Sequence, residues 1–124
     1  MAAPNIIAAS SVYGRTASTN LITTSATEVL SNTDASGVVF KVNTLIVANV
    51  DGSNAADITI SMYSEDNLGG TPSEIIQSAT INAKQNLVVI SKNTPIYLEE
   101  NRSIGATASA GNDLKVTVSY EEIG

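Results

Sequence analysis

Residues 37–63, GVVFKVNTLIVANVDGSNAADITISMY, carry the clearest pattern in the chain. Between residues 38 and 50, mostly apolar residues recur at every second position. This two-residue period indicates a β-strand and not a helix. The members of this phase are Val38, Phe40, Val42, Thr44, Ile46, Ala48 and Val50. The opposite face begins polar, at Lys41 and Asn43, and becomes apolar at Leu45 and Val47. The second half of the strand is therefore predicted to lie in the middle of a sheet.

The four residues after this strand form a turn signal. Residues 51–54, DGSN, tolerate the backbone angles of a tight turn. A second alternating stretch follows at residues 56–63, with Ala56, Ile58, Ile60 and Met62 on one face. The two strands are predicted to pair as an antiparallel hairpin.

The rest of the chain reads as further short strands. Residues 64–71 are polar and Gly-rich and indicate a surface loop. Residues 72–78 match a helix-capping box with proline at the first helical position, but the odd-numbered apolar phase from Ile75 to Ala83 favours a strand. Strands are also predicted at 87–91, 96–98, 103–110 and 114–122, the last two forming a terminal hairpin, with weaker strands near 5–13 and 20–31.

These elements predict an all-β protein. About eight short strands, with turn signals roughly every ten residues, are typical of an antiparallel β-sandwich of jelly-roll-like form. Ile, Val and Leu supply 13, 11 and 7 residues against five aromatic ones, so an aliphatic core is expected. The expected organisation is one domain over residues 1–124, with residues 1–19 as either an N-terminal arm or an edge strand.

The composition argues against an enzyme. The chain contains no His and no Cys, so it can build neither a Ser-His-Asp nor a Cys-His arrangement. Zinc, iron–sulfur and haem ligation through these residues fail for the same reason, and only oxygen-ligated ions remain. We predict no catalytic residue, no cofactor and no metal site.

The charge distribution also limits the classes of partner that the protein is expected to bind. Six basic residues are scattered singly among twelve acidic ones, giving a net charge of −6, whereas binding to phosphate backbones needs clustered cations. The first apolar stretch, residues 6–9, is too short for a secretory signal or a membrane span. No nucleic-acid or membrane partner is expected, and the protein is expected to stay in the cytoplasm until it joins an assembly.

Two groups of acidic residues have a structural and a functional interpretation. Asp51 and Asp57, with side-chain oxygens between them, could ring a calcium ion, but the segment lacks the EF-hand glycine and glutamate. The structural alternative makes Asp51 a turn cap and Asp57 a solvent-facing strand residue. The pairs at 99–100 and 121–122 invite comparison with glycosidase carboxylates, but adjacent strand residues point to opposite faces, which favours solvated strand ends.

Tyr63, Leu68 and Tyr97 are the candidate partner contacts. Tyrosine brings a large contact area and a polar end at low entropic cost. Tyr63 lies on the polar phase of its strand, beside the Gly-rich loop that contains Leu68. Tyr120 shares an apolar phase and is predicted to be a core residue, and for Tyr97 the sequence leaves both a core position and a partner contact open.

Six strand and turn stretches carry a resemblance to a known family: KVNTL at 41–45, VANVDG at 47–52, AADIT at 55–59, LVVI at 87–90, TPIYLEE at 94–100 and VSYEEI at 118–123. They resemble small virion structural proteins of tailed bacteriophages, particularly marine and cyanobacterial phages. The likeness runs from about residue 20 to the end. It implies a β-sandwich subunit of the particle that decorates the capsid or belongs to the neck or tail.

The resulting hypothesis is a non-enzymatic capsid decoration or cement protein. It is expected to be a homo-oligomer in the virion, assembled in the host cytoplasm, with the major capsid protein or other virion proteins as partners. A neck, collar or tail component is the first alternative. A carbohydrate- or calcium-binding module for host attachment, using the polar loops at 49–57 and 64–71, is the second.

Overall fold

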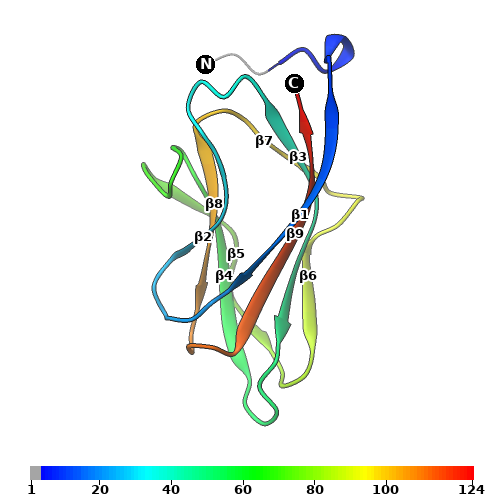
Figure 1. Ribbon diagram of the computed structural model, residues 1–124. Coiled ribbons are helices and arrows are strands. Elements are labelled where there is room, and N and C mark those ends of the chain that lie inside the picture. Colours follow the sequence, from blue (N-terminus) through cyan, green and yellow to red (C-terminus); the bar gives the residue numbers. More distant parts are fainter. Residues whose placement is uncertain (1–3) are drawn as a thin grey trace.

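The computed structural model describes residues 4–124 and contains two antiparallel sheets packed face to face (Figure 1). A three-residue 3-10 turn, η1 (Ile6–Ala8), precedes nine strands. The strands are β1 (Val12–Asn20), β2 (Thr27–Asn32), β3 (Val39–Asn49), β4 (Ala56–Tyr63), β5 (Pro72–Ile81), β6 (Asn86–Ile90), β7 (Ile96–Leu98), β8 (Arg102–Ala108) and β9 (Leu114–Ile123). The predicted all-β sandwich is confirmed.

The strand order is that of a jelly roll. Sheet A has the order β1-β9-β3-β6, with β7 also paired to β3, and sheet B has the order β2-β8-β4-β5. β6 and β7 pair with successive parts of β3 and together occupy one edge position, interrupted by the turn at 91–95. Counted in this way, eight strand positions are divided equally between the two sheets.

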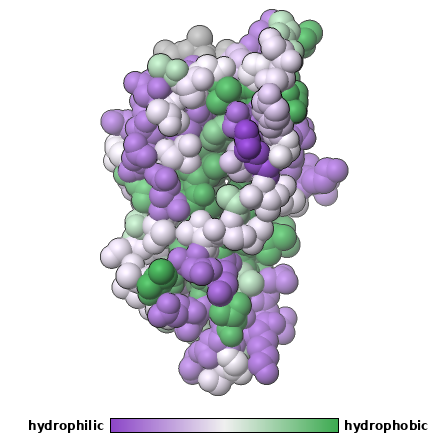
Figure 2. Space-filling view, viewed as in Figure 1, coloured by the Kyte–Doolittle hydropathy of each residue, from purple (hydrophilic) through white to green (hydrophobic). Residues whose placement is uncertain are grey.

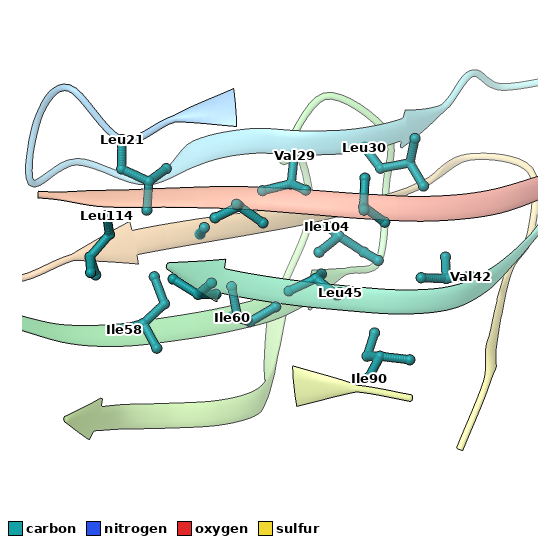
Figure 3. Packing of buried hydrophobic residues seen from close by; sticks show 14 of the residues in the cluster. Leu21, Val29, Leu30, Val42, Leu45, Ile58, Ile60, Ile90, Ile104 and Leu114 are labelled. Atoms are coloured by element: carbon teal, nitrogen blue, oxygen red, sulfur yellow. The ribbon is translucent and has the colours of Figure 1, made fainter. Parts of the chain in front are cut away.

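The core between the sheets is aliphatic, as predicted (Figure 3). The largest fully buried side chains are Leu21, Leu45, Ile58, Ile60, Ile90, Leu98, Ile104, Leu114, Val42, Val47, Val116 and Val118. Phe40 is the aromatic member, and its ring centroid lies 5.0 Å from that of Tyr120. Tyr120 packs against the core and is half-buried, which agrees with its apolar phase.

Both predicted hairpins are wrong. β3 lies in sheet A and β4 in sheet B, and β8 and β9 are divided in the same way. The link after β3 crosses between sheets, and the buried Asn49 holds it by donating to the carbonyls of Asn54 and Ile81. In the link after β8, the backbone N–H of Asn112 donates a hydrogen bond to the carbonyl of Leu21. An alternating strand buries its apolar face equally well in either sheet, so the pattern did not identify its partner.

The single apolar phase predicted for residues 38–50 is also wrong. Phe40 and Val42 face the core, but a bulge between Val42 and Thr44 shifts the register with β9. Leu45 and Val47 are fully buried after the bulge, and Ile46 is only partly buried. The extra residue in the strand reverses which side chains face inward.

The amino-terminal strands lie later than predicted. Residues 5–13 begin with η1, whose first turn is capped by the Asn5 side chain, and β1 starts only at Val12. The stretch 20–31 contains a loop before β2 begins at Thr27. Strand pairing with the end of the chain, which local sequence does not reveal, sets the start of β1. The strand predicted at 72–78 in preference to a helix is confirmed as β5.

Two buried asparagines join the sheets at opposite ends of β3. Asn32, at the end of β2, donates from its amide to the carbonyls of Val38 and Leu98, both at 3.0 Å. Asn49, at the far end of β3, donates to Ile81 at 2.9 Å. Every buried side-chain nitrogen and oxygen in residues 4–124 has a hydrogen-bond partner.

Candidate functional site

Tyr63 and Leu68 lie together on the outer face of sheet B. Both cover Gly105 of β8. A Cβ atom placed on Gly105 would lie 2.9 Å from Cε1 of Tyr63 and 2.8 Å from Cδ2 of Leu68. The absence of a side chain at residue 105 therefore lets these two candidate contact residues approach the sheet.

The loop at 64–71 is fastened to its own sheet. The backbone N–H of Leu68 donates to the Ser103 hydroxyl at 2.9 Å, and that hydroxyl donates to the carbonyl of Glu65 at 2.7 Å. The N–H of Asn67 donates to the Ser31 hydroxyl at 3.0 Å, so the loop also reaches β2. Since Leu68 is half-buried, part of its apolar surface is already used within the chain.

A shallow cavity of about 190 Å³ lies beside this loop. Its lining comes from β4, from β5 and the loop before it, and from β8, and consists of Met62, Tyr63, Ser64, Thr71, Ser73 and Arg102. One nitrogen of Arg102, Nη1, donates to the carbonyls of Ser64 and Asn101, both at 2.9 Å. The guanidinium is positioned by these bonds and, with three hydroxyls, offers hydrogen-bond donors to a small polar molecule.

Arg102 is a charged cavity residue that the sequence does not indicate as part of a site. It was one of six scattered basic residues, and its neighbours in the cavity are about 30 to 40 positions away in the chain. No local signal could have grouped it with Tyr63.

Tyr97 lies elsewhere. It belongs to β7, in sheet A, opposite Lys41 of β3, and 45% of its surface is exposed. The three candidate contact residues therefore fall on two separate surfaces. Figure 2 shows the surface in the same view as Figure 1. Hydrophobic residues lie there in several separate areas among hydrophilic ones.

Asp51 caps its turn, as the structural interpretation predicted. The N–H of Ser53 donates to Oδ1 of Asp51 at 3.3 Å. Hydrogen bonds from the Asn54 side chain and then from the Ser53 backbone hold the pKa of the Asp51 carboxyl below its ordinary value. Asp57 accepts a 2.7 Å bond from the Thr80 hydroxyl across the β4–β5 pair. Over residues 4–124, no group of three or more acidic side chains is arranged to hold a metal ion.

The interpretation of residues 99–100 as a solvated strand end is wrong for Glu100. This side chain is only 6% exposed, and its Oε2 accepts a 2.7 Å bond from the N–H of Gly37. Burial of a carboxylate requires such a donor, and the donor comes from a distant loop. At the other pair, Glu121 accepts from Asn43 at 3.3 Å and Glu122 pairs with Arg15 at 3.0 Å.

Within residues 4–124, the structure has no helix with the length and hydrophobicity of a membrane span. The sequence matches no protein-family model and no curated protein. Fold and surface together define the class of the molecule: an all-β jelly-roll sandwich with an aliphatic core, a fastened outer loop and a shallow polar cavity.

Proposed function

We propose that the protein is a non-enzymatic structural subunit of a tailed-phage particle, and that it binds and stabilises the assembled capsid. The jelly-roll strand order carries the proposal, because this arrangement recurs in viral capsid domains, as it does in lectins and cupins. One fold serves many functions. The resemblance of the chain from about residue 20 onward to small virion proteins is therefore the second support.

The mechanism is linkage between binding and assembly. A subunit that binds the assembled shell and not the separated shell proteins stabilises the shell by mass action. A subunit without disulfide bonds must be durable through packing, which the fully buried aliphatic core supplies.

The test compares particles with and without the protein. Particles that carry it are expected to melt at a higher temperature than depleted particles, and adding the purified protein back is expected to restore the difference. Equal melting temperatures would overturn the stabilising role.

The contact residues are tested in the same assay. Tyr63→Ser and Tyr97→Ser each remove an aromatic side chain from one of the two candidate surfaces. The substitution on the surface that meets the shell is expected to weaken retention on the particle. Val50→Ser, at an exposed residue next to the turn at 51–54, is the matched control. If both tyrosine variants are retained on the particle like the wild type, Tyr63 and Tyr97 are excluded as anchors.

A neck, collar or tail position is the alternative within the same class. Labelling the protein in intact virions separates the two positions. Label over the capsid faces supports the decoration role, and label confined to the neck or tail overturns it in favour of the alternative.

A ligand-binding module is the second candidate function, and the cavity beside Tyr63 favours it. Arg102 and the hydroxyls of Ser64, Thr71 and Ser73 suit the hydroxyl groups of a glycan. Calorimetric titration with calcium and with common glycans tests this function. Heat of glycan binding that disappears in Arg102→Ala, or any heat of calcium binding, would support the module, and no heat with any ligand would overturn it.

A further inference from the structure

One edge of sheet A is formed by β1, and the hydrogen-bonding groups that point away from the sheet there can be assigned. Ser11 and Gly124 exchange two backbone bonds, at 2.9 and 3.0 Å, and Leu21 donates to Leu114 at 3.0 Å. The register with β9 runs without a shift between these two points. Because bonded and non-bonded pairs alternate along an antiparallel ladder, the odd-numbered residues of β1 bond to β9. The N–H and C=O groups of Val12, Gly14, Thr16, Ser18 and Asn20 therefore point to the open side.

The other three edges are protected against pairing with another chain. β5 begins with Pro72, pairs with β4 through two register shifts, and has a positive φ at Ser78. β2 has six residues and a register shift. The β6–β7 edge is interrupted by a turn that contains Pro95. Proline, bulges and short length are the devices that blunt an edge.

β1 has none of these devices. It has nine residues, no proline and an unbroken register, and in the structure described for residues 4–124 it pairs only with β9. Its only charged side chain, Arg15, is neutralised by Glu122 at 3.0 Å. A long, regular edge of this kind is a template for a further strand.

We propose that β1 pairs antiparallel with β1 of a second copy, about a two-fold axis at Thr16. In this register Thr16 faces Thr16 of the second copy, Gly14 faces Ser18, and Val12 faces Asn20. Every outward-pointing residue then meets another outward-pointing residue, so all five donors and acceptors of each edge are satisfied. The two A sheets become one continuous sheet, joined along about 30 Å at roughly 3.4 Å per residue.

The self-complementary register and the absence of acidic residues from β1 favour a second copy as the occupant. The chain has a net charge of −6, so most approaches of two copies bring acidic surfaces together. β1 contains no acidic residue. In the proposed register Arg15 faces Ala17 of the second copy, and the self-complementary interface is closed, as in a two-fold dimer. The pairing depends on the β1 backbone and not on the proposed role in a particle.

Sedimentation measurements on charge variants test the pairing. The wild-type protein is expected to sediment at twice the chain mass of 12.8 kDa. Thr16→Lys and Thr16→Glu each place like charges across the axis, and each alone is expected to be monomeric. An equimolar mixture of the two is expected to restore the dimer. Gln77→Lys, an equal charge change at an exposed residue of β5, is the control and is expected to remain dimeric.

Disulfide trapping tests the register. The chain has no cysteine, so Thr16→Cys can form a disulfide only between copies. Directly opposed bonded residues have Cα atoms about 5.5 Å apart, but their Cβ atoms lie slightly too far apart for an unstrained disulfide, so a short bis-thiol cross-linker is used beside oxidation. The cross-linker is expected to join two copies of Thr16→Cys and not two copies of Gln77→Cys. A monomeric wild-type protein, a dimer unaffected by Thr16→Lys, or a Thr16→Cys variant that does not cross-link would each overturn the proposal.

Discussion

The side-chain amide of Asn49 donates a 2.9 Å hydrogen bond to the backbone carbonyl of Ile81, and this bond joins sheet A to sheet B. Asn49 is only 2% exposed, and its Oδ1 also accepts from the N–H of Asp51. The amide thus holds the link that carries the chain from one sheet to the other. Asn32 has the corresponding role at the opposite end of β3.

Asn49→Ala is expected to lower the free energy of unfolding by about 1–3 kcal/mol, because it leaves buried backbone groups without partners. Urea unfolding followed by circular dichroism measures the change. Asn93→Ala, at an exposed turn residue, is the control and is expected to change stability by less than about 0.5 kcal/mol. Equal stabilities for the two variants would show that the Asn49 amide does not hold the link.

The bulge in β3 gives a second prediction. Leu45→Ala is expected to cost about 2–5 kcal/mol, because Leu45 is fully buried and truncation leaves a cavity. Ile46→Ala is expected to cost less, because Ile46 lies on the other face and is partly exposed. Thermal or urea unfolding of both variants measures the difference. A larger loss of stability in Ile46→Ala than in Leu45→Ala would contradict the bulge and support the single apolar face predicted from the alternation.

Gly105 gives a prediction about the outer loop. Gly105→Ala is expected to destabilise the protein by about 1–3 kcal/mol through overpacking, because the new methyl group meets Tyr63 and Leu68 below 3.0 Å. The tyrosine fluorescence is also expected to change as the Tyr63 ring is displaced. Gly52→Ala is the matched control, since its added Cβ would meet only the end of the Lys84 side chain, at an ordinary contact distance of 3.7 Å. That variant is expected to be as stable as the wild type or up to about 1 kcal/mol more stable. A silent Gly105→Ala would mean that the loop does not rest on β8.

Asp51 gives a prediction about pH. The Asn54 side chain is the main cause of the lowered pKa of Asp51, so Asn54→Ala is expected to raise that pKa toward 3.8. A carboxyl whose folded pKa is depressed stabilises the fold above its ordinary pKa, and this contribution is lost as the pH falls through the lowered value. Carboxyl chemical shifts measured by NMR over an acid titration test the prediction. Asn93→Ala should leave the titration of Asp51 unchanged, and an unchanged titration in Asn54→Ala would rule out the side-chain bond as the cause.

Part of the candidate site could be predicted from the sequence. The outward position of Tyr63 followed from the alternation of β4, and the loop beside it followed from its glycines. The packing of Leu68 on Gly105 and the place of Arg102 in the cavity did not follow from the sequence, because they join segments about 30 to 40 residues apart. The burial of Glu100 depended in the same way on a donor from the loop at Gly37.

By itself, the sequence determined that this is an aliphatic, all-β protein, and it placed β3 to β9 close to where they lie. Alternation and turn residues are local, so they report the presence of a strand and the side of it that avoids water. Only the tertiary structure decided which strands pair, where bulges reverse a face, and where β1 begins. An apolar strand face loses the same contact with water in either sheet, and the choice between sheets depends on distant partners such as Ile81 for Asn49 and Gly124 for Ser11.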